Sequence, residues 1–379
     1  MARPWAVIAG GGTAGHVSPG LAVADALVDR GVPRDAILWI GSRRGLETTL
    51  VPDAGIELIA LPGRGIQRRL APANIAAVGG LLYAIARTVV AFARRRPAVV
   101  LALGGYASVP GVVAAIVWRV PIVITEQNAV PSAANRLAAR FAKACAMPFP
   151  DGPMPNAVWT GNPVRPAIVA VDRTRDRDDA RRRLGVGPEQ TMVLVMGGSL
   201  GARRINDALY DALPAWAGRT DLVVHHIAGA RDHADLVTRR PLDAGDPLDH
   251  RLIRYEDDMA SVYAATDLVL CRAGGNSVAE IAVVGLPSVL VPLPGAPADH
   301  QTHNAAALAA PGGAIVVADA DLDGARLRSE IDALVAVPER RAAMAAAAAS
   351  VGRSDAPAAI AALLETHAAR PQPGGPDDT

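Results

Sequence analysis

Two glycine-rich segments hold the residues of this chain that are best placed to do chemistry. Residues 10–16 read GGGTAGH and residues 197–202 read GGSLGA, and each segment follows a short apolar run. A strand that passes through such a turn into a helix opens a nucleotide-binding unit of the doubly wound type. The sequence therefore predicts two such units, one in each half of the chain.

His16 closes the first segment and stands at the N-terminal end of the expected helix. The helix dipole disfavours the imidazolium form there and helps to keep the ring neutral. A neutral imidazole can accept a proton. His16 is therefore a candidate general base.

Three glycines of the first segment, Gly10, Gly12 and Gly15, also fit the GxGxxG fingerprint of dinucleotide-binding proteins. A nicotinamide enzyme needs an acidic residue after the second strand, whereas Arg43 and Arg44 stand there and suit only a 2′-phosphate. An NADP-dependent oxidoreductase is thus one alternative, and a merely structural tight turn is another.

The second segment has the features of an anion site. It offers backbone N–H groups and the Ser199 hydroxyl at a helix N-terminus, with Arg203 and Arg204 one turn later. Arg165, between the two halves, could clamp a diphosphate in the cleft between the domains. An ordinary interdomain ion pair is an equally good role for Arg165.

A third strand–turn–helix junction covers residues 268–280. Ser277 and Glu280 have the spacing of a capping box, and the carboxylate could equally hold ribose hydroxyls. Farther on, His300 and His303 lack a carboxylate at metal-ligand spacing, so no metal site is expected. A departing diphosphate would then be stabilised by helix dipoles, backbone N–H groups and arginine.

Length and composition set the frame for these motifs. A chain of 379 residues favours two domains. The net charge of +1 and the aromatic content of 3% argue against a nucleic-acid partner. Two cysteines without metal or disulfide spacing indicate a reducing compartment, and no transmembrane helix is expected.

Short apolar runs alternate with helical stretches along the whole chain, which predicts parallel sheets with helices on both faces. We expect an N-terminal domain at residues 1–163, a C-terminal domain at 164–345, a helix at 346–367 that packs back on the N-terminal domain, and a disordered tail at 368–379. The predicted strands are residues 5–9, 37–40, 99–103, 122–125, 157–159, 192–196, 223–227, 252–255, 268–271 and 288–291. The charged stretch 172–183 is interpreted as a solvated linker and first helix.

Six segments, taken together and in this order, resemble the MurG family of sugar transferases, glycosyltransferase family 28. The resemblance runs from about residue 5 to about residue 365. The segments are residues 11–16, 104–108, 125–128, 161–165, 197–202 and 280–282.

The resemblance implies an α/β chain of the GT-B fold, with two Rossmann-like domains whose parallel sheets face a central cleft. It implies a UDP-GlcNAc-dependent hexosyltransferase that acts by inverting, single displacement. The acceptor is the C4 hydroxyl of undecaprenyl-diphosphate-MurNAc-pentapeptide (lipid I), and the product is lipid II for peptidoglycan synthesis. No cofactor is implied.

By the same resemblance, Arg165 and Ser199 serve the donor diphosphate, and Glu280 serves the ribose. Gln301 and Asn304 serve the sugar hydroxyls. The other donor-binding positions implied are Thr13, Ala14, Gly15, Asn128, Glu256, Gly275, Asn276 and Ser277.

The main chain near Glu256 would read the uracil edge, with the Glu256 side chain pointing to solvent. Gly104, Gly105 and Tyr106 would bind the acceptor. His16 and Glu126 are both candidates for the general base, and the helix-terminus argument favours His16.

An apolar stretch at residues 75–92, rimmed by arginines, suits the surface of an anionic membrane. A core helix with a solvated end explains the same pattern equally well. We expect a peripheral enzyme on the cytoplasmic face of the cell membrane, with anionic phospholipid and other cell-wall synthesis proteins as partners. The residues of the stretch are Leu81, Leu82, Ile85, Val89 and Phe92, with Arg68, Arg69, Arg94, Arg95 and Arg96 around them.

Three other functions fit parts of the pattern. One is another GT-B lipid glycosyltransferase, such as a diacylglycerol glucosyltransferase. The second is the NADP-dependent oxidoreductase, and the third is a nucleotide-sugar binding module without catalysis.

Overall fold

The computed structural model describes residues 3–62, 73–150, 152–198, 201–239 and 241–369. The chain divides into two compact units. The N-unit is Met1–Pro163 together with Asp355–Thr379, and the C-unit is Val164–Ser354. Each unit is described by itself.

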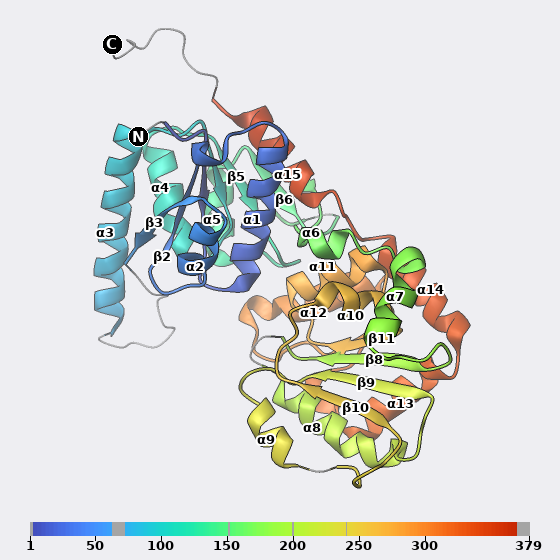
Figure 1. Cartoon of the computed structure of the whole chain (residues 1–379). Coiled ribbons are helices and arrows are strands. Elements are labelled where there is room, and N and C mark those ends of the chain that lie inside the picture. Colours follow the sequence, from blue (N-terminus) through green and yellow to red (C-terminus); the bar gives the residue numbers. More distant parts are fainter. Residues whose placement is uncertain (1–2, 63–72, 151, 199–200, 240, 370–379) are drawn as a thin grey trace. The chain divides into compact units, whose positions relative to one another are not determined.

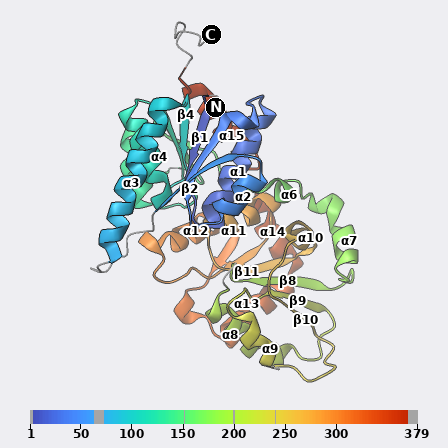
Figure 2. The ribbon, with the colours of Figure 1, turned by 60° about the vertical axis from the view of Figure 1, so that its left-hand side comes forward.

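The N-unit is built on a parallel sheet of seven strands in the order β3-β2-β1-β4-β5-β6-β7. In Figures 1 and 2, α1, α2 and α15 cover one face of this sheet, and α3 and α4 cover the other. The strands are β1 (Ala6–Ala9), β2 (Ile37–Ser42), β3 (Glu57–Leu61), β4 (Val99–Ala102), β5 (Ile122–Thr125), β6 (Ala144–Met147) and β7 (Ala157–Trp159). The helices are α1 (Ala14–Asp29), α2 (Glu47–Asp53), α3 (Ala73–Arg94), α4 (Val109–Val117), α5 (Ala133–Ala138) and α15 (Ala356–His367).

Strands covered on both faces need apolar residues at every position, and β1, β4 and β5 are buried throughout. Helix α1 packs closely on the sheet at Gly20, where an added Cβ would lie 2.5 Å from the Trp39 ring. The Trp39 indole N–H in turn donates to the Gly10 carbonyl at 2.8 Å. The first glycine-rich turn is therefore tied to the core on which α1 rests.

The C-unit has a parallel sheet of six strands in the order β10-β9-β8-β11-β12-β13. Helices α8 and α13 pack together on one face, and α7, α10, α11 and α12 lie on the other (Figure 1). The strands are β8 (Thr191–Met196), β9 (Leu222–Ile227), β10 (Asp249–Ile253), β11 (Leu268–Cys271), β12 (Ser288–Leu290) and β13 (Ala314–Val316). The helices are α6 (Pro166–Val169), α7 (Arg173–Arg183), α8 (Arg203–Ala212), α9 (His233–Thr238), α10 (Met259–Ala265), α11 (Gly275–Val284), α12 (His300–Ala309), α13 (Gly324–Val335) and α14 (Pro338–Ala349).

The predicted α/β class with two Rossmann-like parallel sheets is confirmed. Three strands were not predicted: β3, β6 and β13. Strand β3 is a half-exposed edge strand, β6 is mostly alanine, and β13 has only three residues, so none has a strong apolar signal. The strand predicted at 252–255 is wrong in position, because β10 lies at Asp249–Ile253 and begins with polar residues.

Two segments rich in one residue type became helices with specific partners. The charged stretch before residue 184 forms α7, and its Arg181 is buried against Asp267 rather than solvated. The single helix expected at 346–367 is wrong in its bounds, because residues up to Ala349 belong to α14 in the C-unit. Helix α15 alone packs in the N-unit, with Ile360 and Leu364 in its core and Glu365 paired with Arg30.

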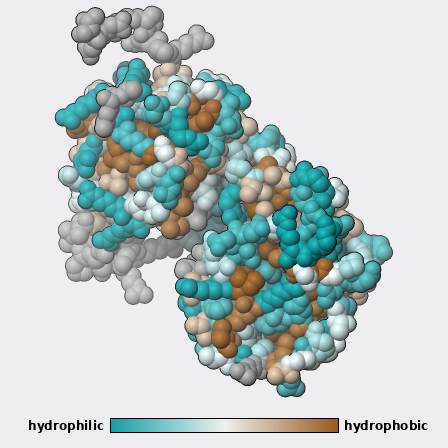
Figure 3. Space-filling view, in the orientation of Figure 1, coloured by the Kyte–Doolittle hydropathy of each residue, from teal (hydrophilic) through white to brown (hydrophobic). Residues whose placement is uncertain are grey.

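Helix α3 is, among the described residues, the one helix long and apolar enough to cross a membrane by length and composition. Its buried side carries Ala77, Ala84 and Phe92, which pack in the N-unit. On the face drawn in Figure 3, hydrophobic residues form patches separated by hydrophilic ones on both units.

Candidate functional site

The N-unit site lies where its strand order reverses, between β1 and β4. In an open parallel sheet, ligands bind outside the carboxyl ends of the strands at this point. The segments that leave β1, β4 and β5 carry residues 10–16, 103–106 and 126–128. The sheet therefore brings the first glycine-rich turn, the Gly104–Gly105 turn and Glu126 to one edge.

A buried carboxylate holds the first glycine-rich turn through hydrogen bonds to its backbone. Glu47 is fully buried and accepts hydrogen bonds from the backbone N–H groups of Gly12 at 2.8 Å and Ser42 at 2.6 Å. A Cβ on Gly11 or Gly45 would lie 2.2 Å or 2.0 Å from the Glu47 carboxylate. Only glycine leaves room for this carboxylate, so Glu47 fixes the path of the turn.

This support also decides what the first turn can bind. A dinucleotide pyrophosphate is held by the free N–H groups of such a turn. Here the Gly12 N–H already donates to Glu47, and a carboxylate beside the turn repels a phosphate. The geometry therefore argues against the NADP alternative. Sequence reasoning missed Glu47, which carries no motif signal of its own.

His16 is the third residue of α1 and has two neighbours at the edge of the sheet. Its Nδ1 lies 3.4 Å from the Thr13 hydroxyl, and its Nε2 lies 3.8 Å from the place a Cβ on Gly105 would take. Burial lowers the pKa of His16, while the carboxylates of Glu126 and Glu47 act in the opposite direction. Burial therefore keeps the ring neutral near pH 7, as a proton acceptor must be.

Glu126 is buried and surrounded by donors. Its Oε1 accepts from the N–H groups of Gln127 at 3.0 Å and Asn128 at 3.1 Å, and from the Asn128 amide at 3.3 Å. Its Oε2 accepts from the Ser132 N–H and the Asn135 amide, both at 2.9 Å. These bonds fold the loop around the carboxylate and occupy its lone pairs.

The predicted acceptor residues lie at the end of β4. Gly104 and Gly105 both have positive φ, +88° and +71°, which favours glycine at each position. The Tyr106 hydroxyl donates to the Ala77 carbonyl of α3 at 3.0 Å, and burial raises its pKa. Tyr106 therefore joins this turn to α3.

The C-unit has its own pocket at the matching point of its sheet, between the carboxyl ends of β8 and β11. Its volume is about 530 Å³. The second glycine-rich turn forms one wall, and the start of α11 with Ser277 forms another. Four arginines line it, namely Arg203, Arg204, Arg231 and Arg272.

Arg272 is the most constrained of the four arginines. It forms an ion pair with Asp319 and donates to the carbonyls of Val291 and Pro292, both at 3.2 Å. Its Nε is buried without a partner in the described part of the chain. Sequence reasoning did not single out Arg272 or Arg231. The position of Arg272 directly after the predicted strand 268–271 was a signal that could have identified it.

A second polar group in the C-unit joins Arg165, Glu280 and Tyr263. Arg165 Nη2 lies 3.1 Å from Glu280 Oε1, and the Tyr263 hydroxyl donates to Oε2 at 2.9 Å. The capping box expected for Ser277 and Glu280 is wrong, because Gly274 is the N-cap of α11 and no side chain caps it. Both partners of the Arg165 ion pair belong to the C-unit, so it is not the interdomain pair that was one of the two alternatives for Arg165.

Gln301 lines the pocket. Its Oε1 accepts from the Leu293 N–H at 3.0 Å, which fixes the amide so that Nε2 remains a donor. Asn304 is fully buried and donates to the Ala273 carbonyl at 3.0 Å, so it supports the loop before α11.

The expectation that Glu256 points to solvent is wrong. Its Oε2 lies 3.3 Å from His225 Nε2, and its Oε1 accepts from the Asp258 N–H at 3.0 Å. The carboxylate thus holds the start of α10 against β9.

Three further predicted donor-binding positions are Ser199, Gly275 and Asn276. Ser199 lies outside the described residues. Gly275 and Asn276 are the first two residues of α11, next to the pocket. No group of three or more His, Cys, Asp and Glu side chains able to hold a metal ion occurs in the described ranges.

Comparison with known proteins places both halves in one family. The model of the glycosyltransferase family 28 N-terminal domain matches residues 6–147, and that of the C-terminal domain matches residues 192–360. This chain belongs to the MurG family. A relative from Nocardioides sp. is 43% identical over 94% of this chain and 96% of its own length.

That relative is named UDP-N-acetylglucosamine–N-acetylmuramyl-(pentapeptide) pyrophosphoryl-undecaprenol N-acetylglucosamine transferase. A relative of the same name from Acidothermus cellulolyticus is 41% identical, over 96% of this chain and 98% of its own length. The crystal structure of Acinetobacter baumannii MurG matches with a TM-score of 0.77 at 29% identity, over 95% of this chain and 99% of that one. The resemblance to the MurG family and the GT-B fold that it implied are confirmed.

Proposed function

We propose that this chain transfers N-acetylglucosamine from UDP-GlcNAc to the C4 hydroxyl of lipid I, with inversion, to give lipid II. Relatives named for this transfer match it over nearly their whole length. The observation that carries the proposal is the difference between its two glycine-rich turns. One leads to a neutral histidine, and the other lies in a pocket lined by arginines.

The donor diphosphate binds in the arginine-lined pocket of the C-unit. The N–H groups of the second glycine-rich turn and the guanidinium of Arg272 neutralise its charge. The same groups stabilise the additional charge on UDP as the glycosidic bond breaks. Ser199 completes this part of the site by family resemblance.

The ribose hydroxyls bind Glu280, whose carboxylate is oriented by Tyr263 and Arg165. Each carboxylate oxygen has a further lone pair for a ribose hydroxyl. By the family resemblance, Arg165 also serves the diphosphate, and it would leave Glu280 to do so when donor binds. Gln301 donates to the sugar hydroxyls, and Asn304 supports the loop behind them.

His16 acts as the general base. The acceptor C4 oxygen bonds to the anomeric carbon while the bond from that carbon to the UDP oxygen breaks, and His16 takes the hydroxyl proton. The lowered pKa keeps His16 able to accept it. Glu126 is less suited to this role because its lone pairs are held by five fixed donors. Gly104, Gly105 and Tyr106 hold the acceptor.

Helix α3 holds the N-unit at an anionic membrane surface. Its exposed large side chains are Val78, Leu82, Tyr83 and Val90; Val78 and Leu82 lie one helical turn apart, and Tyr83 and Val90 lie two turns apart. Arg87 and Arg94 lie exposed on the same helix, where anionic headgroups attract them. The stretch expected to face the membrane included Phe92, which is instead buried in the core.

The transfer is tested with purified full-length chain, radiolabelled UDP-GlcNAc and a short-chain lipid I analogue. The expected result is label in the lipid II analogue, and none with diacylglycerol as acceptor. Label in diacylglycerol alone would favour the other lipid glycosyltransferase. Binding of UDP-GlcNAc without transfer to either acceptor would favour a binding module and overturn the proposal.

The membrane surface is tested by flotation with phosphatidylglycerol vesicles. Leu82→Ser should reduce vesicle binding about tenfold or more, because a buried leucine contributes about 1.5–3 kcal/mol. Leu137→Ser is the matched control, since Leu137 is 64% exposed and Leu82 is 62% exposed in the same unit. Equal binding by both variants would remove α3 from this role.

A further inference from the structure

A second arginine-lined cavity lies in the C-unit, at the other edge of its sheet. It has a volume of about 450 Å³. Asp267 and Pro287 in its wall come directly before β11 and β12, at the amino ends of these strands. The donor pocket is at the carboxyl ends of the sheet, so the two cavities are separate.

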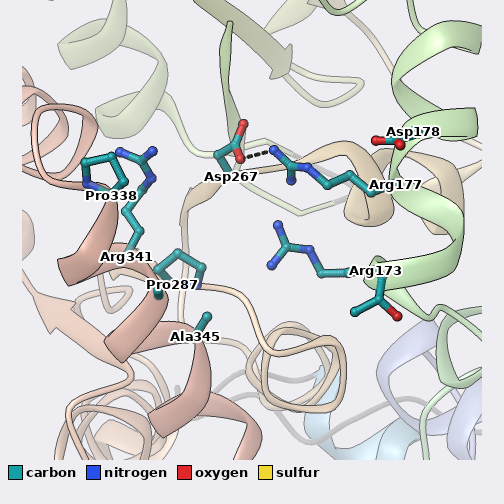
Figure 4. A pocket seen from close by; sticks show the side chains of 10 residues that line it. Arg173, Arg177, Asp178, Asp267, Pro287, Pro338, Arg341 and Ala345 are labelled. Carbon is teal, nitrogen blue, oxygen red and sulfur yellow. Dashed lines mark hydrogen bonds and ion pairs between the residues drawn. The ribbon is translucent and has the colours of Figure 1, made fainter. Parts of the chain in front are cut away.

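Three arginines line this cavity from two helices. Arg173 and Arg177 come from α7, and Arg341 comes from α14 on the opposite side, with its guanidinium beside Pro338 (Figure 4). These residues lie in the first or second turn of helices of 11 and 12 residues. The positive ends of both helix dipoles add to the charge of the arginines.

The carboxylate in the wall does not balance this charge. Asp267 forms ion pairs with Arg177 and Arg181, the latter at 3.0 Å, and also accepts from the Met192 N–H at 2.8 Å. Its carboxylate oxygens are thus already bound to groups of α7 and β8. The other acidic residue of the lining, Asp178, is exposed.

Arg173 and Arg341 bind only carbonyl groups in the described part of the chain. Arg173 donates to Thr266 and Gly285, and its Nε is buried without a partner. Arg341 donates to the Leu334 and Val335 carbonyls through Nη1 alone. Each therefore keeps donors for a ligand.

The charge of Arg173 is poorly compensated. Burial lowers its pKa, and Arg177 and Arg181 lower it further, while Asp267 acts in the opposite direction. A cation held in this way among other cations gains most from an anion that reaches it. Paired guanidinium groups match the oxygens of a phosphoryl group in both charge and geometry.

We propose that this cavity binds a small soluble phosphoryl anion, a phosphate or diphosphate, through Arg173, Arg177 and Arg341. The site is independent of the donor pocket and of the transfer reaction. Binding is linked to folding of the C-unit, so the ligand also raises its thermal stability.

Pyrophosphate is the probe, titrated by calorimetry into the full-length chain at constant ionic strength with UDP present at saturation. Arg341→Gln and Ala342→Glu should each weaken binding about tenfold or more. Ala342 lines the cavity, so its replacement adds a carboxylate while every arginine stays in place. Ala343→Glu is the matched control, with the same charge change at an exposed position of α14 outside the lining.

The outcomes separate cleanly. Weaker binding in Arg341→Gln and Ala342→Glu, with Ala343→Glu like the parent, supports the site. Equal affinity in Ala342→Glu and Ala343→Glu overturns it, as does the absence of any pyrophosphate binding once UDP is saturating. Melting temperatures without ligand identify a variant that has lost its fold, and Ala342→Glu then decides alone.

Discussion

The two glycine-rich turns have the same local architecture and different electrostatic surroundings. Each connects the central strand of a parallel sheet to the following helix, at the point where the strand order reverses. The turn in the N-unit is closed from below by the Glu47 carboxylate. The turn in the C-unit also lies beside a buried carboxylate, Asp232, but this carboxylate is paired with Arg231 and Arg203, and four arginines line the pocket.

This difference shows how one backbone motif serves two chemistries. In the N-unit the carboxylate takes up a backbone N–H that would otherwise bind phosphate, and the next helix presents His16. In the C-unit the N–H groups and arginines favour an anion. The turn fixes the backbone geometry, and residues from elements distant in sequence decide what it binds.

The largest effect is expected from removal of the proposed general base, which tests the role of the first turn in the comparison. His16→Ala should lower kcat by about 100- to 10,000-fold, because a positioned general base contributes that much. The KM for UDP-GlcNAc should change little, since the diphosphate and the ribose of the donor bind to the other unit. Steady-state kinetics with a lipid I analogue measures both. His303→Ala, an exposed histidine of α12, is the control, and an unchanged kcat in His16→Ala would exclude His16.

The second prediction concerns the arginine pocket. Arg272→Gln should raise the KM for UDP-GlcNAc roughly 10- to 100-fold, as expected for the loss of a charge-assisted hydrogen bond. Its effect on kcat should be smaller than that of His16→Ala. Arg203→Gln should have a weaker effect, because Arg203 is 68% exposed. An Arg272→Gln enzyme with the parent KM and melting temperature would contradict the assignment.

The third prediction tests the buried support of the first turn. Glu47→Gln keeps one carbonyl oxygen for two N–H donors and should cost about 1.5–3 kcal/mol of unfolding free energy. The Glu47 carboxylate raises the pKa of His16, so its neutralisation lowers that pKa further. The acid limb of the kcat profile should therefore move to lower pH.

Glu57→Gln is the control for this experiment. Glu57 is a partly exposed residue of β3 that pairs with Arg95, far in sequence from the turn. If the acid limb moves equally in both variants, or in neither, then Glu47 does not act on the pKa of His16 and the prediction is wrong.

The fourth prediction contrasts the acid stability of the units. In the C-unit, burial lowers the pKa of His226 to about 3 and that of His250 to about 4, and also lowers that of His225. These folded-state values lie below the unfolded value near 6.5, so the stability that they confer is complete above that pH. It is lost as the pH falls below 6.5, at up to about 1.4 kcal/mol per histidine and pH unit.

Within the described part of the N-unit, His16 is the one histidine whose pKa is lowered, so acid should unfold the C-unit first. Calorimetry between pH 7.5 and 5 measures this as a fall in the melting temperature of one transition before the other. Replacement of His250 by Gln should reduce the effect. A C-unit transition that does not move with pH would contradict the prediction.

Much of the fold could be predicted because it rests on local signals. Residues 122–125, 157–159 and 268–271 were predicted as strands with the observed bounds, since each is a short apolar run between turns. The weak strands β3, β6 and β13 escaped notice, because edge position or small residues remove that signal. The roles of Glu126 and Asn304 as supports likewise depend on partners that only folding brings near.

The sequence by itself determined two doubly wound parallel units, two glycine-rich turns and a histidine at a helix start. These follow from periodicity, glycine and helix-end chemistry, which act over a few residues. Only the tertiary structure decided which charge surrounds each turn. Glu47 is 35 residues from Gly12, and Arg272, at the end of another strand, lines the same pocket as the second turn. Electrostatic and hydrogen-bond partners act through space, so the fold, and not the order of residues along the chain, selects them.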